Sequence, residues 1–266
     1  MTMKQDILAT IIAHKKNEIR EQMCAVPIEM IERLISNPTE GYSMSRKIQL
    51  SPTGIIAEFK RKSPSKGWIN KEAEPVSITR GYMKNGASAI SVLTDNHFFG
   101  GSLKDLKDVR SIVDIPVLRK DFIISEYQIY QAKAVKADAI LLIAAALEKE
   151  ECQRLVKKAH ELKLEVLLEI HSEKELEYYS DDIEMIGINN RNLGSFNTDI
   201  NNSLHLIEKL PKNCIKISES GISDINVIKE LKKAGFDGFL IGETFMRNND
   251  PADCLKNTIN MLREIL

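Results

Sequence analysis

The chain has 266 residues, of which 43% are hydrophobic, so it can bury a full core and is not a candidate for disorder. Its 37 basic and 38 acidic residues nearly cancel, which excludes a global charge that would attract nucleic acid or an anionic membrane. The N-terminal segment is polar, and the longest apolar run, residues 139–147, is too short to span a bilayer. We therefore expect a cytoplasmic protein in which a local cluster binds any anion.

The cysteines and histidines indicate neither a disulfide framework nor a metal site. No two cysteines form a CxxC pair, and the histidines form no HxH or HExxH arrangement. The cysteines are Cys24, Cys152, Cys214 and Cys254. Their wide spacing is typical of reduced thiols in a cytosolic protein.

Two helices are expected before any strand. Apolar residues recur at helical spacing over residues 6–20 and again over residues 27–35. A polar connector over residues 37–45 follows. These features predict a helical extension at the N-terminus.

From residue 54 onward, strand and helix patterns alternate to the end of the chain. Strands are expected over residues 55–60, 87–94, 116–122, 139–144, 165–170, 185–191, 214–220 and 238–242. Helices are expected over residues 76–84, 103–111, 126–136, 149–162, 173–179, 204–209, 224–233 and 252–266. Eight such units predict an α/β fold, a (β/α)8 TIM barrel over residues 48–266, with residues 1–47 packing on the barrel mouth. A doubly wound sheet is the alternative, but no GxGxxG follows the first strand.

The first strand leads directly into a polar loop. Because side chains alternate along a strand, Glu58 and Lys60 share one face. The loop over residues 61–67 adds three cations, the hydroxyl of Ser63 and a second serine. This composition suits anion binding, although an exposed basic turn is the alternative.

Other strands also end in chemically useful residues, and a TIM barrel builds its active site at the carboxyl ends of its strands. Alternation places Lys120 between Leu118 and Phe122 on one face, and it points Glu169 inward. The further polar residues at strand ends are Asn189, Arg191 and Glu219. Each could pair structurally, but their convergence favours an active site.

The last two strand exits are rich in glycine and suit a phosphate. Backbone N–H groups of Ser220, Gly221, Gly242 and Glu243 could converge there, and a short helix starting near Glu243 would add its N-terminus. Simple turns are the alternative. At other exits, Phe99 could stack with Phe122 against an aromatic substrate.

Four motifs in this order resemble the indole-3-glycerol-phosphate synthase family of tryptophan biosynthesis. They are AEFKRKSPSKG (57–67), LRKDF (118–122), GINNRNL (187–193) and SESGI (218–222), supported by residues 167–171 and 240–243. The resemblance covers nearly the whole chain and implies a barrel with a helical extension. It also implies a carboxy-lyase that converts 1-(2-carboxyphenylamino)-1-deoxyribulose 5-phosphate to indole-3-glycerol phosphate, with loss of carbon dioxide and water and without a cofactor.

The same resemblance implies roles for the residues at the strand ends. Lys120 would be the general acid, with Glu169 balancing its charge, and Lys60 would hold the substrate carboxylate and assist dehydration with Glu58. Ser63 and Asn189 would orient the substrate, supported by Arg191 and Glu219. Backbone groups of Ser220, Gly221, Gly242 and Glu243 would bind the phosphate. An apolar wall would be formed by Phe99, Phe122 and Leu142.

Two other functions remain open from the residues alone. An inward lysine, Lys120 or Lys60, would also serve a Schiff-base aldolase acting on another sugar phosphate. The same pocket could belong to a non-catalytic module that only binds a sugar phosphate. In each case the partner is a small anion, and we favour a monomer.

Overall fold

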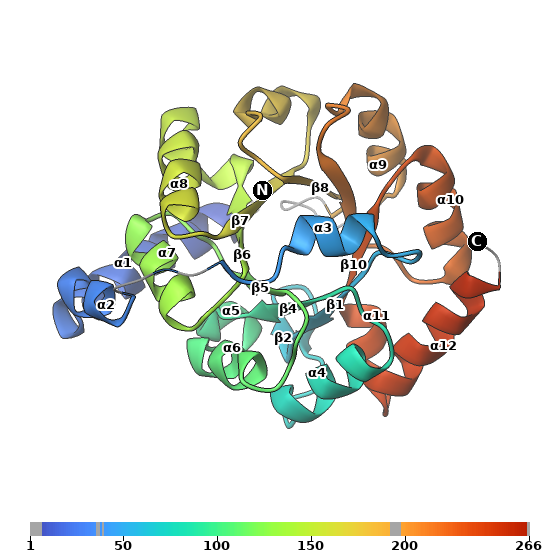
Figure 1. Ribbon diagram of the computed structural model, residues 1–266, viewed down its shortest axis with the longest axis horizontal. Coiled ribbons are helices and arrows are strands. Elements are labelled where there is room, and N and C mark those ends of the chain that lie inside the picture. The colour runs from blue at the N-terminus through green and yellow to red at the C-terminus, as the bar shows by residue number, and fades with distance from the viewer. Residues whose placement is uncertain (1–6, 36–37, 39, 192–197, 265–266) are drawn as a thin grey trace, which may run out of the picture.

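The computed structural model describes residues 7–35, 38, 40–191 and 198–264. In this part of the chain, eight parallel strands close into a barrel in the order β1, β10, β9, β8, β7, β6, β5, β4, surrounded by helices (Figure 1). The barrel strands are β1 (Ile55–Phe59), β4 (Ala89–Leu93), β5 (Val117–Lys120), β6 (Ala139–Ile143), β7 (Glu165–Ile170), β8 (Met185–Asn189), β9 (Ile215–Glu219) and β10 (Gly238–Ile241). The predicted TIM barrel is confirmed.

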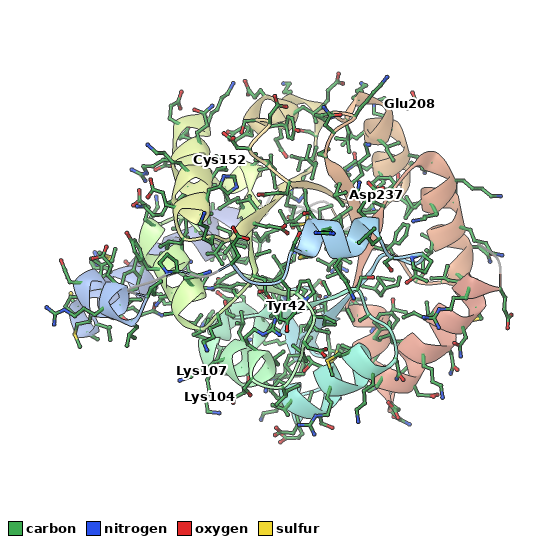
Figure 2. All side chains as sticks on the ribbon, viewed as in Figure 1. Tyr42, Lys104, Lys107, Cys152, Glu208 and Asp237 are labelled. Atoms are coloured by element: carbon green, nitrogen blue, oxygen red, sulfur yellow. The ribbon has the colours of Figure 1, made fainter. Side chains whose placement is uncertain are left out.

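Helices follow the strands along the chain and form the outer layer. They are α4 (Pro75–Lys84), α5 (Asn96–Phe99), α6 (Leu103–Arg110), α7 (Glu126–Ala134), η1 (Ala144–Ala146), α8 (Lys149–Glu161), η2 (Glu173–Tyr178), α9 (Asn201–Leu206), η3 (Ile207–Lys209), α10 (Ile225–Ala234), α11 (Glu243–Met246) and α12 (Pro251–Arg263). The apolar stripes of these helices face the strands, while polar residues such as Lys104 and Lys107 of α6 extend outward (Figure 2). A small hairpin, β2 (Lys62–Ser63) with β3 (Gly67–Trp68), lies in the loop after β1.

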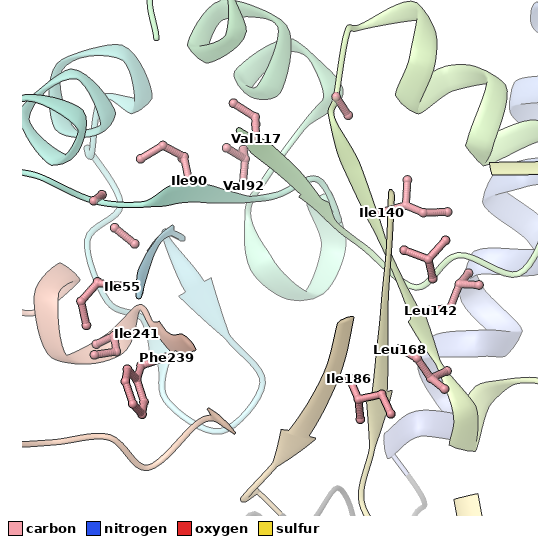
Figure 3. Close-up of a cluster of buried hydrophobic side chains, with 14 of the residues drawn as sticks. Ile55, Ile90, Val92, Val117, Ile140, Leu142, Leu168, Ile186, Phe239 and Ile241 are labelled. Carbon is pink, nitrogen blue, oxygen red and sulfur yellow. The ribbon is translucent and has the colours of Figure 1, made fainter. Parts of the chain in front are cut away.

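The strands are buried on both faces because helices cover the outside of the barrel and side chains fill its inside. Outward residues such as Val92, Leu168 and Phe239 pack against the helices (Figure 3). Inward residues such as Ile56 and Leu167 form a second cluster within the barrel. These two layers explain why strands such as β6 and β10 read as continuous apolar runs rather than as alternating ones.

A short helix, α3 (Met44–Gln49), closes the amino-terminal end of the barrel, which faces the viewer in Figure 1. Its Met44 and Ile48 are fully buried in the inner cluster. The carboxylate of Glu165, at the start of β7, accepts hydrogen bonds from the backbone N–H groups of Met44 and Ser45, at 2.7 and 2.8 Å. The predicted polar connector ended at residue 45, and no element was predicted over the rest of α3, because so short a helix carries too little periodicity to be recognised.

The two predicted N-terminal helices are present as α1 (Ile7–Ala25) and α2 (Ile28–Leu34). The first turns of α1 lie against the barrel interior, whereas α2 packs beside α7, where Ile31 and Tyr127 share an apolar cluster. The Tyr127 hydroxyl donates to the backbone oxygens of Gln22 and Val26, which fixes the end of α1. The predicted boundary between the N-terminal extension and the barrel, at residue 47, stays a prediction. No described helix is both long and apolar enough to cross a bilayer.

Candidate active site

A pocket of about 560 Å³ opens at the carboxyl ends of the barrel strands. Every site residue predicted from the sequence lines it, except Leu142. The residues brought together are Glu58, Lys60, Ser63, Phe99, Lys120, Phe122, Glu169, Asn189, Arg191, Glu219, Ser220, Gly221, Gly242 and Glu243. The far end of the GINNRNL motif, residues 192 and 193, lies outside the described residues.

The prediction for Leu142 is wrong. This residue of β6 is fully buried on the outer face of the barrel with Leu168, as Figure 3 shows. Its neighbours Leu141 and Ile143 line the pocket instead. The reason is the alternation of the strand: residues 139–143 are all apolar, so no polar side chain marks which set points inward.

Lys120, the last residue of β5, lies between two carboxylates. Its Nζ is 2.9 Å from Oε2 of Glu169 and 2.6 Å from Oε2 of Glu219. Burial alone would lower the pKa of Lys120, but attraction to Glu169, Glu219 and Glu58 outweighs burial and raises it above the usual value. The lysine is therefore an ammonium ion at neutral pH.

Glu169, on β7, is the ionised partner of Lys120. Burial would raise its pKa, but Lys120 and His171 outweigh burial, and hydrogen bonds from Lys120 and Asn189 help to lower the pKa to about 2. Asn189 Nδ2 donates to Oε1 of Glu169 over 3.1 Å. The carboxylate is thus held in one orientation by Lys120 of β5 and Asn189 of β8.

Glu219, at the end of β9, has the opposite character. Burial, aided by the nearby charge of Glu169, outweighs the attraction of Lys120 and raises the pKa of Glu219 to about 7. Its side chain fits because Gly187 stands opposite on β8: a Cβ there would lie 2.1 Å from Oε1 of Glu219. The cluster therefore holds one carboxylate that stays ionised and one that can exchange a proton near neutral pH.

A second acid and base pair lies at the end of β1. Lys60 Nζ is 2.6 Å from Oε1 of Glu58, and both side chains are mostly buried. Gly242, after β10, gives the carboxylate its space, since a Cβ there would lie 2.2 Å from Oε1 of Glu58. Lys60 and Lys120 are thus each paired with at least one carboxylate in the pocket.

The loops after β9 and β10 have the backbone shape expected of an anion site. Ser220 and Gly221 have φ angles of 65° and 72°, so two successive residues are left-handed, and Gly221 has no room for a Cβ beside Thr198. After β10, the short helix α11 starts at Glu243, as predicted, with Gly242 as its N-cap. Both glycines line the pocket.

Two arginines lie beside these loops. Arg191 Nη1 donates to Oγ of Ser65 over 2.7 Å, and its Nη2 lies 3.3 Å from Oε2 of Glu243. Arg247 Nη2 lies 2.6 Å from Oε1 of the same glutamate. The sequence analysis missed Arg247, although its spacing of four residues from Glu243 on a short helix was the available signal.

Of the three extra cations in the loop after β1, only Lys66 lines the pocket. Arg61 forms a two-point ion pair with Asp105 and donates to the backbone oxygen of Ala73. Lys62 donates to the backbone oxygen of His97. These two cations hold the loop to its neighbours.

The aromatic side of the pocket is formed by Phe99 of α5 and Phe122 after β5, with ring centroids 6.0 Å apart. Leu8 and Ile11 of α1 complete the apolar lining, and sequence reasoning did not assign them to the site. The sequence analysis expected the N-terminal extension to pack on the barrel mouth, but periodicity alone did not identify these two residues as part of the site. Within the described residues, no cluster of three or more His, Cys, Asp or Glu could hold a metal ion.

Comparison with known proteins gives one family over nearly the full chain. A family model described as indole-3-glycerol phosphate synthase matches residues 8–258. The chain is 56% identical over 259 residues to the indole-3-glycerol phosphate synthase of Bacteroides thetaiotaomicron, covering 97% of this chain and 100% of that protein. It is 45% identical to the enzyme of the same name from Neisseria meningitidis serogroup B, covering 92% of this chain and 96% of that one.

Solved structures with low identity share the fold. Thiamine phosphate pyrophosphorylase from Pyrococcus furiosus superposes with a TM-score of 0.61 at 17% identity, covering 84% of this chain and 100% of the other. For 3-hexulose-6-phosphate synthase from Salmonella typhimurium the TM-score is 0.61 at 11% identity, with coverages of 79% and 99%. At these identities the likeness concerns the barrel alone.

Proposed function

The chain belongs to the indole-3-glycerol phosphate synthase family, and from this premise we propose how its pocket carries out the reaction. The reaction is the decarboxylating and dehydrating ring closure of 1-(2-carboxyphenylamino)-1-deoxyribulose 5-phosphate to indole-3-glycerol phosphate, a lyase step of tryptophan biosynthesis. The aromatic carbon that bears the carboxylate attacks the ketone carbon. Carbon dioxide then leaves, and loss of water completes the indole.

Lys120 is the general acid for the ring closure. A ketone is a poor electrophile until its oxygen is protonated, and Lys120 is a charged donor that faces the pocket from the end of β5. As the carbon–carbon bond forms, the ketone oxygen gains negative charge and the ammonium both stabilises that charge and donates a proton. This protonated lysine, held between two carboxylates, is the observation that carries the proposal.

Glu169 and Glu219 divide the remaining work at Lys120. Glu169 stays ionised and orients the ammonium, since its pKa is lowered to about 2. Glu219 lies 2.6 Å from Lys120 Nζ and has its pKa raised to about 7, so it can pass a proton to the lysine after the lysine has given one up. Both carboxylates contact the Nζ of Lys120, the group that donates the proton.

Lys60 and Glu58 serve the substrate carboxylate and the dehydration. Lys60 faces the pocket from the end of β1 and can pair with the carboxylate before carbon dioxide leaves. Glu58, 2.6 Å from Lys60, is the matching base for removal of a proton when water is lost. Ser63 and Asn189 orient the substrate between the two lysines.

The phosphate binds at the exits of β9 and β10, to backbone N–H groups of Ser220, Gly221, Gly242 and Glu243. The left-handed pair after β9 and the start of α11 after β10 support this assignment. Arg191 and Arg247 add positive charge beside these loops.

The aromatic wall, which we define as Phe99 and Phe122, presses the anilino ring toward the ketone. With the phosphate and the carboxylate both fixed, this contact brings the two reacting carbons together, and proximity is a large part of the barrier to a cyclisation. We also propose that the enzyme is a monomer, and the bacterial biosynthetic relatives support a cytoplasmic location. Size-exclusion chromatography with light scattering checks the monomer.

The test is to supply the carboxyphenylamino deoxyribulose phosphate and follow indole fluorescence. Turnover supports the assignment, and binding without turnover would leave only a sugar-phosphate-binding module. A Schiff-base aldolase is the other alternative, but a nucleophilic lysine must be neutral, and the pKa of Lys120 is raised. Borohydride trapping with substrate separates these chemistries, because only an imine leaves a stable adduct.

A further inference from the structure

Lys15 lies on α1, outside the barrel, yet its side chain is only 2% exposed. Lysines are almost never buried to this degree unless they are paired. The ammonium contacts three carboxylates: Asp95 Oδ2 at 2.8 Å, Glu18 Oε2 at 2.8 Å and Asp121 Oδ1 at 3.1 Å. Two of these belong to the barrel, at the exits of the neighbouring strands β4 and β5.

Asp121 connects Lys15 to the loop that carries one half of the aromatic wall. Its Oδ1, which faces Lys15, accepts a hydrogen bond from the backbone N–H of Phe122 over 2.8 Å. Its Oδ2 accepts from Thr94 over 2.6 Å and from Arg119 over 2.9 Å. The carboxylate is thus fixed on both sides, and it directly follows Lys120 in the chain.

Asp95 connects Lys15 to the other half of the wall. Its Oδ1 accepts from the backbone N–H of Phe98 over 2.7 Å and so caps the start of α5, whose last residue is Phe99. Its Oδ2 pairs with Lys15. Among the described residues, no second cation forms an ion pair with Asp95, so Lys15 balances this fully buried carboxylate.

Lys15 also shares a helix face with pocket residues. Leu8, Ile11 and Lys15 are spaced by three and four residues, which places them on one side of α1, and the first two line the pocket. The ammonium therefore anchors this face of α1 to the two strand exits.

We propose that Lys15 is a positioning residue for substrate binding: one buried ammonium holds Asp95 and Asp121 together, and through them it sets the spacing of Phe99 and Phe122 beneath α1. The inference rests on the proposed role of the aromatic wall. The chemistry at Lys120 needs only the groups described above, so loss of Lys15 should weaken binding of the anilino ring far more than it slows the chemical steps.

The experiment compares Lys15→Met with Lys16→Met, which removes an exposed charge from the next position of the same helix. We expect Lys15→Met to raise KM by ~10-fold while kcat changes by less than ~3-fold, the pattern of lost ground-state binding. Lys16→Met should leave both constants at parental values. Equal KM values for the two variants would overturn the proposal.

A double variant separates positioning from stability. Lys15→Met leaves Asp95 buried without its cation, which lowers the unfolding midpoint, whereas Lys15→Met with Asp95→Asn removes both charges and keeps an oxygen to cap α5. We expect the double variant to regain part of the midpoint and to keep the raised KM. Recovery of KM together with the midpoint would overturn the proposal. A parent protein that fails to turn the substrate over would instead overturn the proposed function.

Discussion

Nζ of Lys120 and Oε2 of Glu219 lie 2.6 Å apart across the barrel, and the two residues have pKa values shifted upward for opposite reasons. Burial raises the pKa of the carboxyl, whereas nearby carboxylates raise that of the ammonium. A charged donor and a carboxyl that exchanges protons near neutral pH therefore share one hydrogen bond.

Replacing Lys120 by Met should separate chemistry from binding. The aliphatic length is roughly kept while the proton and the charge are lost, so kcat should fall by at least ~10²-fold, the low end for a missing general acid. KM should change much less, because the interaction with the ketone oxygen strengthens only in the transition state. Steady-state kinetics provide the measurement.

Lys60→Met is the matched comparison for this variant. It should raise KM as well as lower kcat, because the proposed contact of Lys60 with the substrate carboxylate already exists in the ground state. Near-parental turnover by Lys120→Met, or a borohydride adduct on Lys120, would rule out the general-acid role.

Glu219→Gln should change how stability depends on pH. The pKa of Glu219 is about 7 in the folded protein against an ordinary value of 4.5, so between these values the folded state binds more protons than the unfolded state. The residue therefore makes the free energy of unfolding fall as pH rises through this window. The variant, which cannot titrate, should show a flatter profile from pH 4.5 to 7 in denaturant titrations. An unchanged slope would contradict the raised pKa of Glu219.

Arg247→Met should weaken binding of inorganic phosphate. Removing a cation beside the loops after β9 and β10 should raise the inhibition constant of phosphate and the KM together, with little change in kcat. Lys104→Met, on the exposed face of α6, is the control for loss of one positive charge. Equal inhibition constants in the two variants would place the phosphate site elsewhere.

Ile11→Ala and Ile19→Ala form a pair that tests the role of α1. Both isoleucines are buried on the same helix, but Ile11 lines the pocket, whereas Ile19 packs with Tyr127 away from it. Each change should lower the free energy of unfolding by about 2–5 kcal/mol. Only Ile11→Ala should also raise KM, and an equal rise for Ile19→Ala would mean that α1 acts through stability alone.

The sequence was sufficient to predict the residues whose position depends on local alternation. Glu58, Lys120 and Glu169 follow from strand parity plus the rule that barrel sites form at strand ends, and both hold without knowledge of distant contacts. The prediction for Leu142 failed because alternation alone does not say which set of side chains points inward. A polar residue is needed to mark the inward face, and β6 has none. The same alternation thus gave a correct result where charge marked the inward face and an incorrect one where it did not.

The residues that could not be predicted come from segments far from the motifs. Leu8, Ile11 and Lys15 show helical periodicity, but periodicity does not say which surface a helix covers. The burial of Lys15 depends on Asp95 and Asp121, roughly 80 to 106 residues further along the chain. Such pairings exist only once the barrel has brought the strand exits together.

Helix α3 closes the amino-terminal end of the barrel, and this limits the route by which the products leave. Met44 and Ile48 fill the amino-terminal end of the barrel and the inner side chains fill its middle, so the pocket communicates with solvent through its mouth. Carbon dioxide, which is formed inside the pocket while the organic product is still bound, must leave through the same mouth. Because residues of α1 and of the loop after β1 line this pocket, we expect both segments to influence the rate of product release.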